Sequence, residues 1–199
     1  MQQVITIYAE STPNPGAMKF VANKMLVKGD AVDFKNPEEA TKSSPLATRL
    51  FTFPFVRGVF IAANFISVTK SESVDWSEVA MELREFIRDY LNTGEPVLTE
   101  TEVVATEHTS PLNMATDDAV PRTDIEQQIV NILEEYIRPA VEQDGGAISF
   151  HSYNQGVVKV LLKGACSGCP SSTITLKAGI EGLMKRMIPE VQAVEAVSA

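Results

Sequence analysis

Residues 157–187 read VVKVLLKGACSGCPSSTITLKAGIEGLMKRM, and their pattern predicts the architecture of the second half of the chain. The first seven residues of this stretch are dominated by Val and Leu, which predicts a strand over 157–163. Pro170 suits the first position of a helix, and apolar residues at helical spacing continue that helix to about Met187. The stretch therefore predicts a strand, a short cysteine loop and a helix in succession.

The flanking residues extend this pattern in both directions. Residues 123–126, Thr-Asp-Ile-Glu, form a capping box that begins another helix, which we expect to end near Pro139. Turns are predicted at 144–146 and 154–156, and strands at 147–152, 157–163 and 191–197. The order α-β-β-α-β predicts an α+β sandwich with its helices over one face of the sheet.

Both helices of this unit carry an apolar stripe at the spacing of a helix that buries one face. The first stripe comprises Ile125, Ile129, Ile132, Leu133, Tyr136 and Ile137. The second comprises Leu176, Ile180, Leu183, Met184, Met187 and Ile188. We expect these side chains to form the core of the unit.

The first half of the chain also alternates strands and helices. Strands are predicted at 4–8, 17–22, 58–62 and 64–69, a turn at 11–16, and a short helix from Pro45 to Phe51. A capping box at 75–78, Asp-Trp-Ser-Glu, begins a longer helix that ends at Gly94. Its predicted buried face comprises Val79, Leu83, Phe86, Ile87, Tyr90 and Leu91.

Acidic residues gather between the two halves. The segment 95–123 holds six acidic residues against one basic residue and has little periodicity, so we expect a flexible, self-repelling linker. The predicted fold class is thus α+β, with two small α/β-sandwich domains, 1–94 and 124–199, joined by this acidic linker.

The composition excludes several classes of protein. A formal net charge of −9 argues against a nucleic-acid binder and against adhesion to anionic membranes. We expect no membrane span, because no stretch approaches the roughly 18–20 apolar residues that one requires. Residues 1–10 show no signal-peptide pattern, so we expect a cytoplasmic protein.

The chain has two cysteines, Cys166 and Cys169, spaced C-x-x-C before the predicted helix. In a reducing compartment such a pair indicates metal or redox chemistry rather than a structural disulfide. The helix N-terminus favours the thiolate, which is the form that binds metals and attacks disulfides. Two thiolates supply half of a four-thiolate shell, so a second copy of the chain would complete it.

Four chemistries remain open for this pair. An iron–sulfur cluster or a zinc ion could be shared between two chains, although neither His108 nor His151 lies near the cysteines in sequence. A dithiol–disulfide oxidoreductase would use Cys166 as nucleophile and Cys169 as resolver. The fourth alternative is that the two cysteines stay reduced and have no chemical role.

Residues 164–181 resemble the signature of NifU-like C-terminal domains, the Nfu-type iron–sulfur proteins. Residues 137–146 and 188–191 are also similar to that family. The first half resembles the N-terminal domain often fused to Nfu proteins, at residues 12–20, 45–47, 58–59, 65–70 and 75–76.

The resemblance implies a carrier or late-acting scaffold, not an enzyme. Such proteins hold a [4Fe-4S] cluster between two subunits and pass it to apo-proteins, and the matching ligands here are Cys166 and Cys169. A [2Fe-2S] cluster would take the same four thiolates. The implied partners are a second copy of the chain, apo iron–sulfur clients and an upstream assembly scaffold. A client-binding adaptor acting through residues 1–94 is a further alternative.

Overall fold

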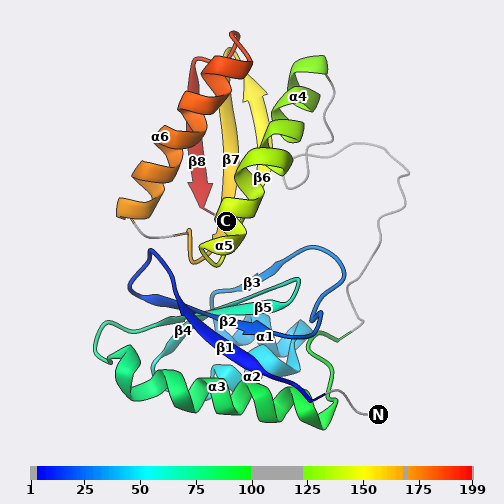
Figure 1. Ribbon diagram of the computed structural model, residues 1–199, viewed down its shortest axis with the longest axis vertical. Helices are drawn as coiled ribbons and strands as arrows, with labels where there is room; N and C mark the ends of the chain where they lie inside the picture. The colour runs from blue at the N-terminus through cyan, green and yellow to red at the C-terminus, as the bar shows by residue number, and fades with distance from the viewer. Residues whose placement is uncertain (1–3, 100–122, 168–169, 199) are drawn as a thin grey trace. The chain divides into compact units, whose positions relative to one another are not determined.

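Two sheets organise the chain, one in each half (Figure 1). The computed structural model describes residues 4–99, 123–167 and 170–198. The chain divides into two compact units, Met1–Val104 and Ala105–Ala199. Most of the segment 95–123, which we expected to be an acidic linker, lies outside the described residues.

The first unit is built on a five-stranded antiparallel sheet with the order β1-β2-β5-β4-β3. The strands are β1 (Ile7–Ser11), β2 (Ala17–Ala22), β3 (Val32–Phe34), β4 (Val56–Ala62) and β5 (Phe65–Lys70). The helices are α1 (Pro37–Ser43), α2 (Pro45–Leu50) and α3 (Trp76–Thr93). The predictions for β2, α2, β4, β5 and α3 are confirmed, whereas the first strand begins at Ile7 rather than at residue 4.

One face of this sheet packs on the helices to form the core. Alternate strand residues point to that face and join the side chains of α2 and α3 in one buried cluster, because successive strand side chains point to opposite faces. Its strand and helix members include Phe20, Ala22, Val59, Ile61, Ile66, Val68, Leu46, Leu50, Leu83 and Ile87.

Helix α1 and strand β3 were not predicted from the sequence. Asn36 caps α1 by accepting a hydrogen bond from the Glu39 amide, and Pro37 follows it at the first helical position. These signals stand in the sequence, but Ala40 is the buried residue of this seven-residue helix, so it has no apolar stripe. Only three residues form β3, which is too short for a visible alternation.

The N-terminus of α3 differs from the predicted capping box. The Asp75 carboxylate accepts hydrogen bonds from the amide and the hydroxyl of Ser77, which hold the pKa of Asp75 below its ordinary value. The amide of Glu78 instead donates to the backbone carbonyl of Asp75. Asp75 therefore caps the helix, as predicted, but through the second helical residue rather than the third.

Trp76 fixes the turn at residues 11–16. Its indole Nε1 donates to the carbonyl of Pro15 at 2.9 Å, and its ring packs against the core of the first unit. The Lys70 ammonium lies 5.5 Å from the centre of the same ring, within the range of a cation–π interaction. The turn is thus tied to the start of α3, 61 residues away in sequence.

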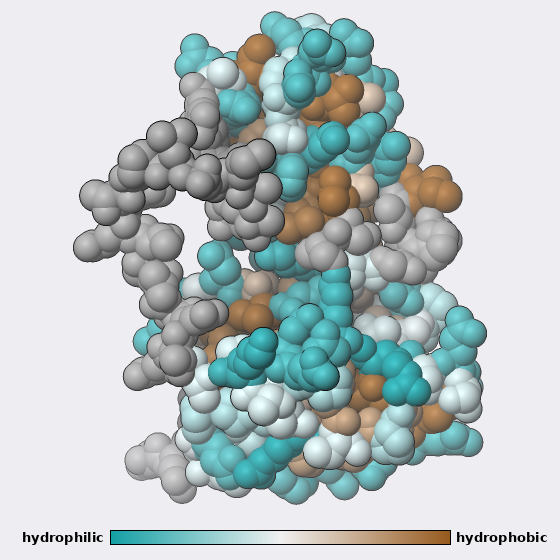
Figure 2. Space-filling view, turned by 180° about the vertical axis from the view of Figure 1, so that it is seen from behind, coloured by the Kyte–Doolittle hydropathy of each residue, from teal (hydrophilic) through white to brown (hydrophobic). Residues whose placement is uncertain are grey.

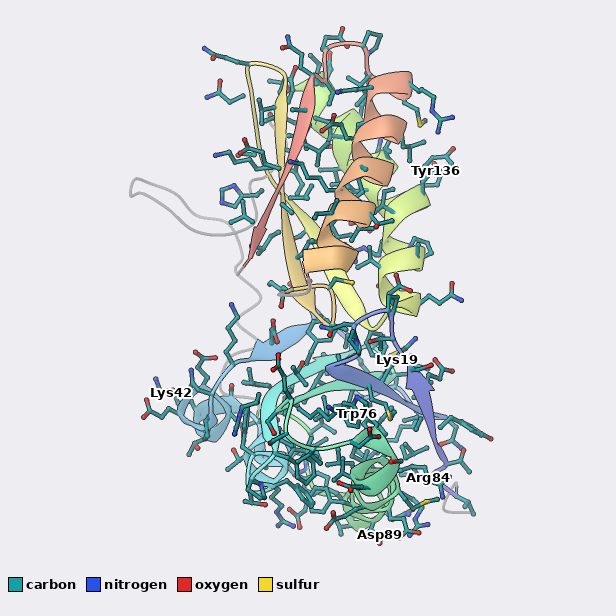
Figure 3. All side chains as sticks on the ribbon, turned by 90° about the vertical axis from the view of Figure 1, so that its left-hand side faces the viewer. Lys19, Lys42, Trp76, Arg84, Asp89 and Tyr136 are labelled. Atoms are coloured by element: carbon teal, nitrogen blue, oxygen red, sulfur yellow. The ribbon has the colours of Figure 1, made fainter. Side chains whose placement is uncertain are left out.

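The second unit confirms the predicted order α-β-β-α-β. Its sheet has the order β6-β7-β8, in which β6 (Gly146–Asn154) and β7 (Val157–Gly164) are antiparallel and β8 (Ala193–Ser198) runs parallel to β7. Seen in Figure 3, α4 (Asp124–Ile132) and α6 (Pro170–Met187) lie on the same side of this sheet. The capping box at 123–126 forms as predicted.

We expected the first helix of this unit to end near Pro139, but the helical segment continues to Gln143. A π-helical turn, η2 (Leu133–Ile137), follows α4 and leads into α5 (Arg138–Gln143), which has Pro139 in its first turn. Figure 1 draws the three as one continuous helical ribbon. The π turn changes the hydrogen-bond register just before Pro139, whose nitrogen cannot donate, so the helix passes the proline instead of stopping.

Two residues predicted in the core lie at the surface. Tyr136, in the π turn, is 50% exposed and points away from the sheet in Figure 3, whereas Ile137 beside it is buried. Met187, at the end of α6, is 44% exposed, while Met184 is fully buried. Ideal helical spacing does not hold through a π turn or at a helix end, which explains both errors.

The surface of the described residues is mixed in character. Figure 2 shows hydrophobic residues in separate small patches among hydrophilic ones on the face that it presents. Within the described ranges, no helix is both long enough and apolar enough to cross a membrane.

Gly94 supplies the first testable prediction. It ends α3 with φ of 78°, in the left-handed region, and a Cβ added there would meet no atom within 4 Å. We expect Gly94→Ala to lower the free energy of unfolding of the first unit by about 1 kcal/mol, through backbone strain alone. The fluorescence of Trp76, the only tryptophan in the chain, reports urea unfolding of this unit.

Gly29→Ala is the matched control. A Cβ on Gly29 would also meet nothing within 4 Å, and its φ lies outside the left-handed region. An equal loss of stability in both variants would show that backbone conformation at Gly94 is not the cause.

Candidate functional site

The cysteine motif follows β7 at one end of the second sheet. Cys166 lies in a turn over residues 164–167, which we call the cysteine turn, whereas Cys169 lies outside the described residues. The turn is closed by the backbone amide of Ser167, which donates to the carbonyl of Gly164 at 3.0 Å. The Ser167 hydroxyl donates to the same carbonyl at 3.0 Å. As predicted, α6 then begins at Pro170.

Cys166 is buried, contrary to the exposed ligand that a cluster shared between two chains would lead one to expect. It is 4% exposed and belongs to the same apolar cluster as Val141, Ile148 and Ile180. A thiol is a small side chain with weak hydrogen-bonding capacity, so it packs in this environment as an apolar group does. The sulfur is therefore stored inside the unit rather than presented to solvent.

Gly146 makes room for this thiol. A Cβ added to Gly146 would lie 2.7 Å from Sγ of Cys166 and 2.7 Å from the carbonyl oxygen of Lys163. Real Cβ atoms essentially never approach other atoms so closely. Gly146 also pairs with Gly164 across β6 and β7, which places it directly beside the cysteine turn.

A backbone hydrogen bond joins the turn at 144–146 to the cysteine turn. The amide of Ala165 donates to the carbonyl of Gly145 at 3.2 Å. The sequence predicted the 144–146 turn but not its contact with Cys166, which lies 20 residues later. The sequence holds one signal of this contact. A simple turn requires one glycine, whereas Gly145 is followed by a second, Gly146, which indicates a close approach of another part of the chain.

Cysteine sulfur is the donor chemistry that the described part of this site offers. No group of three or more His, Cys, Asp or Glu side chains gathers into a metal site within the described ranges. His151 lies on β6 at the bulge between Phe150 and Ser152, and its Nδ1 lies 3.2 Å from the Ser152 hydroxyl. Thiolates are the protein ligands of iron–sulfur clusters, so the donor type at Cys166 fits such a group.

Comparison with protein families matches both units. The family model described as "Scaffold protein Nfu/NifU N terminal" matches residues 7–94. The model described as "NifU-like domain" matches residues 129–195, which include both cysteines.

Two curated relatives cover nearly the whole chain. "NFU1 iron-sulfur cluster scaffold homolog, mitochondrial" of Drosophila erecta is 39% identical over 192 residues, which is 96% of this chain and 64% of the relative. "NifU-like protein 4, mitochondrial" of Arabidopsis thaliana is 35% identical over 198 residues, 98% of this chain and 66% of the relative. The chain thus spans slightly less than two thirds of the length of these relatives. Their names give no support to the cytoplasmic location that we expected.

A solved structure matches half of the chain. The solution NMR structure of a NifU-like protein from Saccharomyces cerevisiae covers 50% of this chain and 90% of its own, with 27% sequence identity and a TM-score of 0.45.

The burial of Cys166 supplies a prediction on stability. We expect Cys166→Ser to lower the free energy of unfolding of the second unit by about 1–2 kcal/mol, because it places a hydroxyl in an apolar cluster. Urea unfolding followed by far-UV circular dichroism would show the loss. Trp76 fluorescence reports the first unit and should not shift. An unchanged dichroism transition would mean that the side chain at 166 is in contact with water.

Proposed function

The chain belongs to the Nfu family of NifU-like proteins, and from this premise we propose that it is an iron–sulfur cluster carrier. In this proposal a [4Fe-4S] cluster is the cargo, held between two copies of the chain by Cys166 and Cys169 of each. The carrier passes the cluster to apo-proteins and receives it from an upstream assembly scaffold. The names of the relatives, which call one of them an iron–sulfur cluster scaffold, support this role.

The single observation that carries the proposal is the cysteine count. The chain has two cysteines, and both lie within the segment matched as a NifU-like domain. Four thiolates complete the ligand set of either a [4Fe-4S] or a [2Fe-2S] cluster. A symmetric dimer supplies four from two chains, because its two-fold axis repeats each ligand.

Transfer follows from this sharing of ligands. An incoming client thiolate replaces one carrier thiolate at iron, so each exchange leaves the cluster with the same number of sulfur ligands. Once two ligands of one chain have been replaced, that chain is no longer bound to the cluster. This chemistry makes and breaks iron–sulfur bonds by substitution and needs no catalytic acid or base.

We further propose that the working division of the chain is 1–94, 95–123 and 124–199. The matched segments 7–94 and 129–195 lie inside the two outer parts. Both cysteines belong to the last part, so cluster binding is assigned to it. The first part then serves client choice, dimer formation or shielding of the cluster.

The burial of Cys166 speaks against the dithiol oxidoreductase. Nucleophilic cysteines of such enzymes lie in partly exposed, electropositive surroundings, where an incoming disulfide reaches the sulfur. Cys166 is instead 4% exposed and lies in an apolar cluster. A cluster ligand shared with a second chain must also reach the surface, so burial weighs on both functions, and the match to the NifU-like domain is what favours the carrier.

Anaerobic reconstitution with iron and sulfide tests the carrier. We expect about two irons and two sulfides per chain, since one [4Fe-4S] cluster is divided between two copies. Iron, sulfide and oligomeric state should be measured on one sample, and the dimer should dissociate when a chelator removes the iron. A monomer without bound iron would contradict the proposal.

Variants of the cysteines separate the two functions. Cys166→Ser and Cys169→Ser should each abolish cluster binding to about the same extent, whereas His151→Ala should bind a full cluster. An oxidoreductase behaves differently, because loss of the resolving Cys169 alone traps mixed disulfides with substrates. Trapped disulfides with Cys169→Ser, together with no iron in the intact chain, would favour the enzyme.

A further inference from the structure

We propose that the cysteine turn, residues 164–167, opens and closes, and that Gly146 is the positioning residue that holds Cys166 in the closed state. The inference rests on the proposed function in one respect, since it takes Cys166 as a cluster ligand. A ligand shared with a second chain must reach the surface, yet the thiol of Cys166 is buried. The structure is thus the closed state, and the cluster binds the open one.

In the closed state, Sγ of Cys166 fills a small space beside Gly146, which we call the thiol seat. Sγ of Cys166 occupies the space where a Cβ at position 146 would lie, only 2.7 Å from that Cβ. The carbonyl of Lys163 limits the same space from the side of β7, also at 2.7 Å. Any side chain larger than that of glycine at 146 would therefore displace the thiol, the carbonyl or both.

The turn is built to move as a unit. Its internal bonds, from the amide and hydroxyl of Ser167 to the carbonyl of Gly164, join residues of the turn to one another. Gly164 has φ of 68° and is the last residue of β7, so the chain changes direction there at a residue with broad backbone freedom. Rotation at Gly164 would separate the amide of Ala165 from the carbonyl of Gly145, which are joined by a 3.2 Å hydrogen bond in this structure.

The frame below the turn is stiff by comparison. β7 is the central strand of the sheet and pairs with β6 as far as Gly164 and with β8 as far as Leu162. Opening therefore exposes one thiol without separating the strands. Local openings of this kind have lower free energies than global unfolding.

The seat affects both loading and release. Cluster affinity is reduced by the fraction of chains that are closed, because only the open state presents the ligand. After transfer, closure returns the thiol to an apolar site and away from the departing cluster. Burial of the thiol thus lowers the affinity of the chain for the cluster. A lower affinity suits a carrier better than a protein that keeps its cluster permanently.

Alkylation of a single thiol tests the closed state without any cluster. In full-length Cys169→Ser, iodoacetamide should modify Cys166 at least about tenfold more slowly in buffer than in denaturing guanidinium. The rate in buffer should depend only weakly on added urea, at concentrations below the unfolding transition, because a small opening exposes little surface.

Two results would overturn the proposal. An alkylation rate in buffer close to that of the unfolded chain would mean that the thiol of Cys166 is not buried. A urea dependence as steep as that of equilibrium unfolding would mean that Cys166 reacts only when the whole unit unfolds. Neither result depends on cluster reconstitution, so failure of this inference is distinct from failure of the proposed function.

A second glycine substitution tests the role of Gly146. In the Cys169→Ser chain, Gly146→Ala should raise the alkylation rate of Cys166 at least about fivefold, with far-UV dichroism unchanged. Gly182→Ala is the matched control, because a Cβ there would meet nothing within 4 Å, and it should leave the rate unchanged. A native dichroism spectrum with an unchanged rate in Gly146→Ala would exclude Gly146 as the positioning residue. If that variant does not fold, the urea series on the Gly146 chain decides the proposal.

Discussion

The sulfur of Cys166 lies 2.7 Å from the position that a Cβ of residue 146 would take, and this close packing governs the cysteine end of the second unit. It requires glycine at 146, and it constrains the position of Cys166 in the cysteine turn. Because Gly146 pairs with Gly164, the same contact joins the start of the β6–β7 hairpin to the cysteine turn. Tight interior packing leaves no room for partial occupancy, so the thiol is either in this site or out of it.

This constraint joins two demands that usually conflict. A cluster ligand must be available to metal, whereas a free thiol in an oxidisable position must be protected. An apolar site beside Gly146 satisfies the second demand when no cluster is bound. A turn that can rotate at Gly164 satisfies the first, and it does so without disturbing the three paired strands.

Much of this fold could be predicted from local signals in the sequence. Capping residues, turn glycines and apolar stripes identified α3, α4 and α6, and the order of elements gave the architecture of the second unit. The errors have local causes as well. Pro139 predicts a helix end, but the π turn that accommodates this proline leaves no pattern in the sequence. The site was different, because the burial of Cys166 depends on Gly146, which is distant in sequence and adjacent only after the hairpin has formed.

The proposed function joins dimer formation and cargo binding in one equilibrium. If the ligands of one cluster come from two chains, loading depends on the concentration of the chain as well as on that of the cluster. Linkage is reciprocal, so whatever favours the dimer tightens the hold on the cluster, and closure of either cysteine turn loosens both. The free energy of seating Cys166 against Gly146 therefore opposes cluster binding twice in each dimer. A small packing contact, repeated by symmetry, is sufficient to shift a carrier from retention toward release.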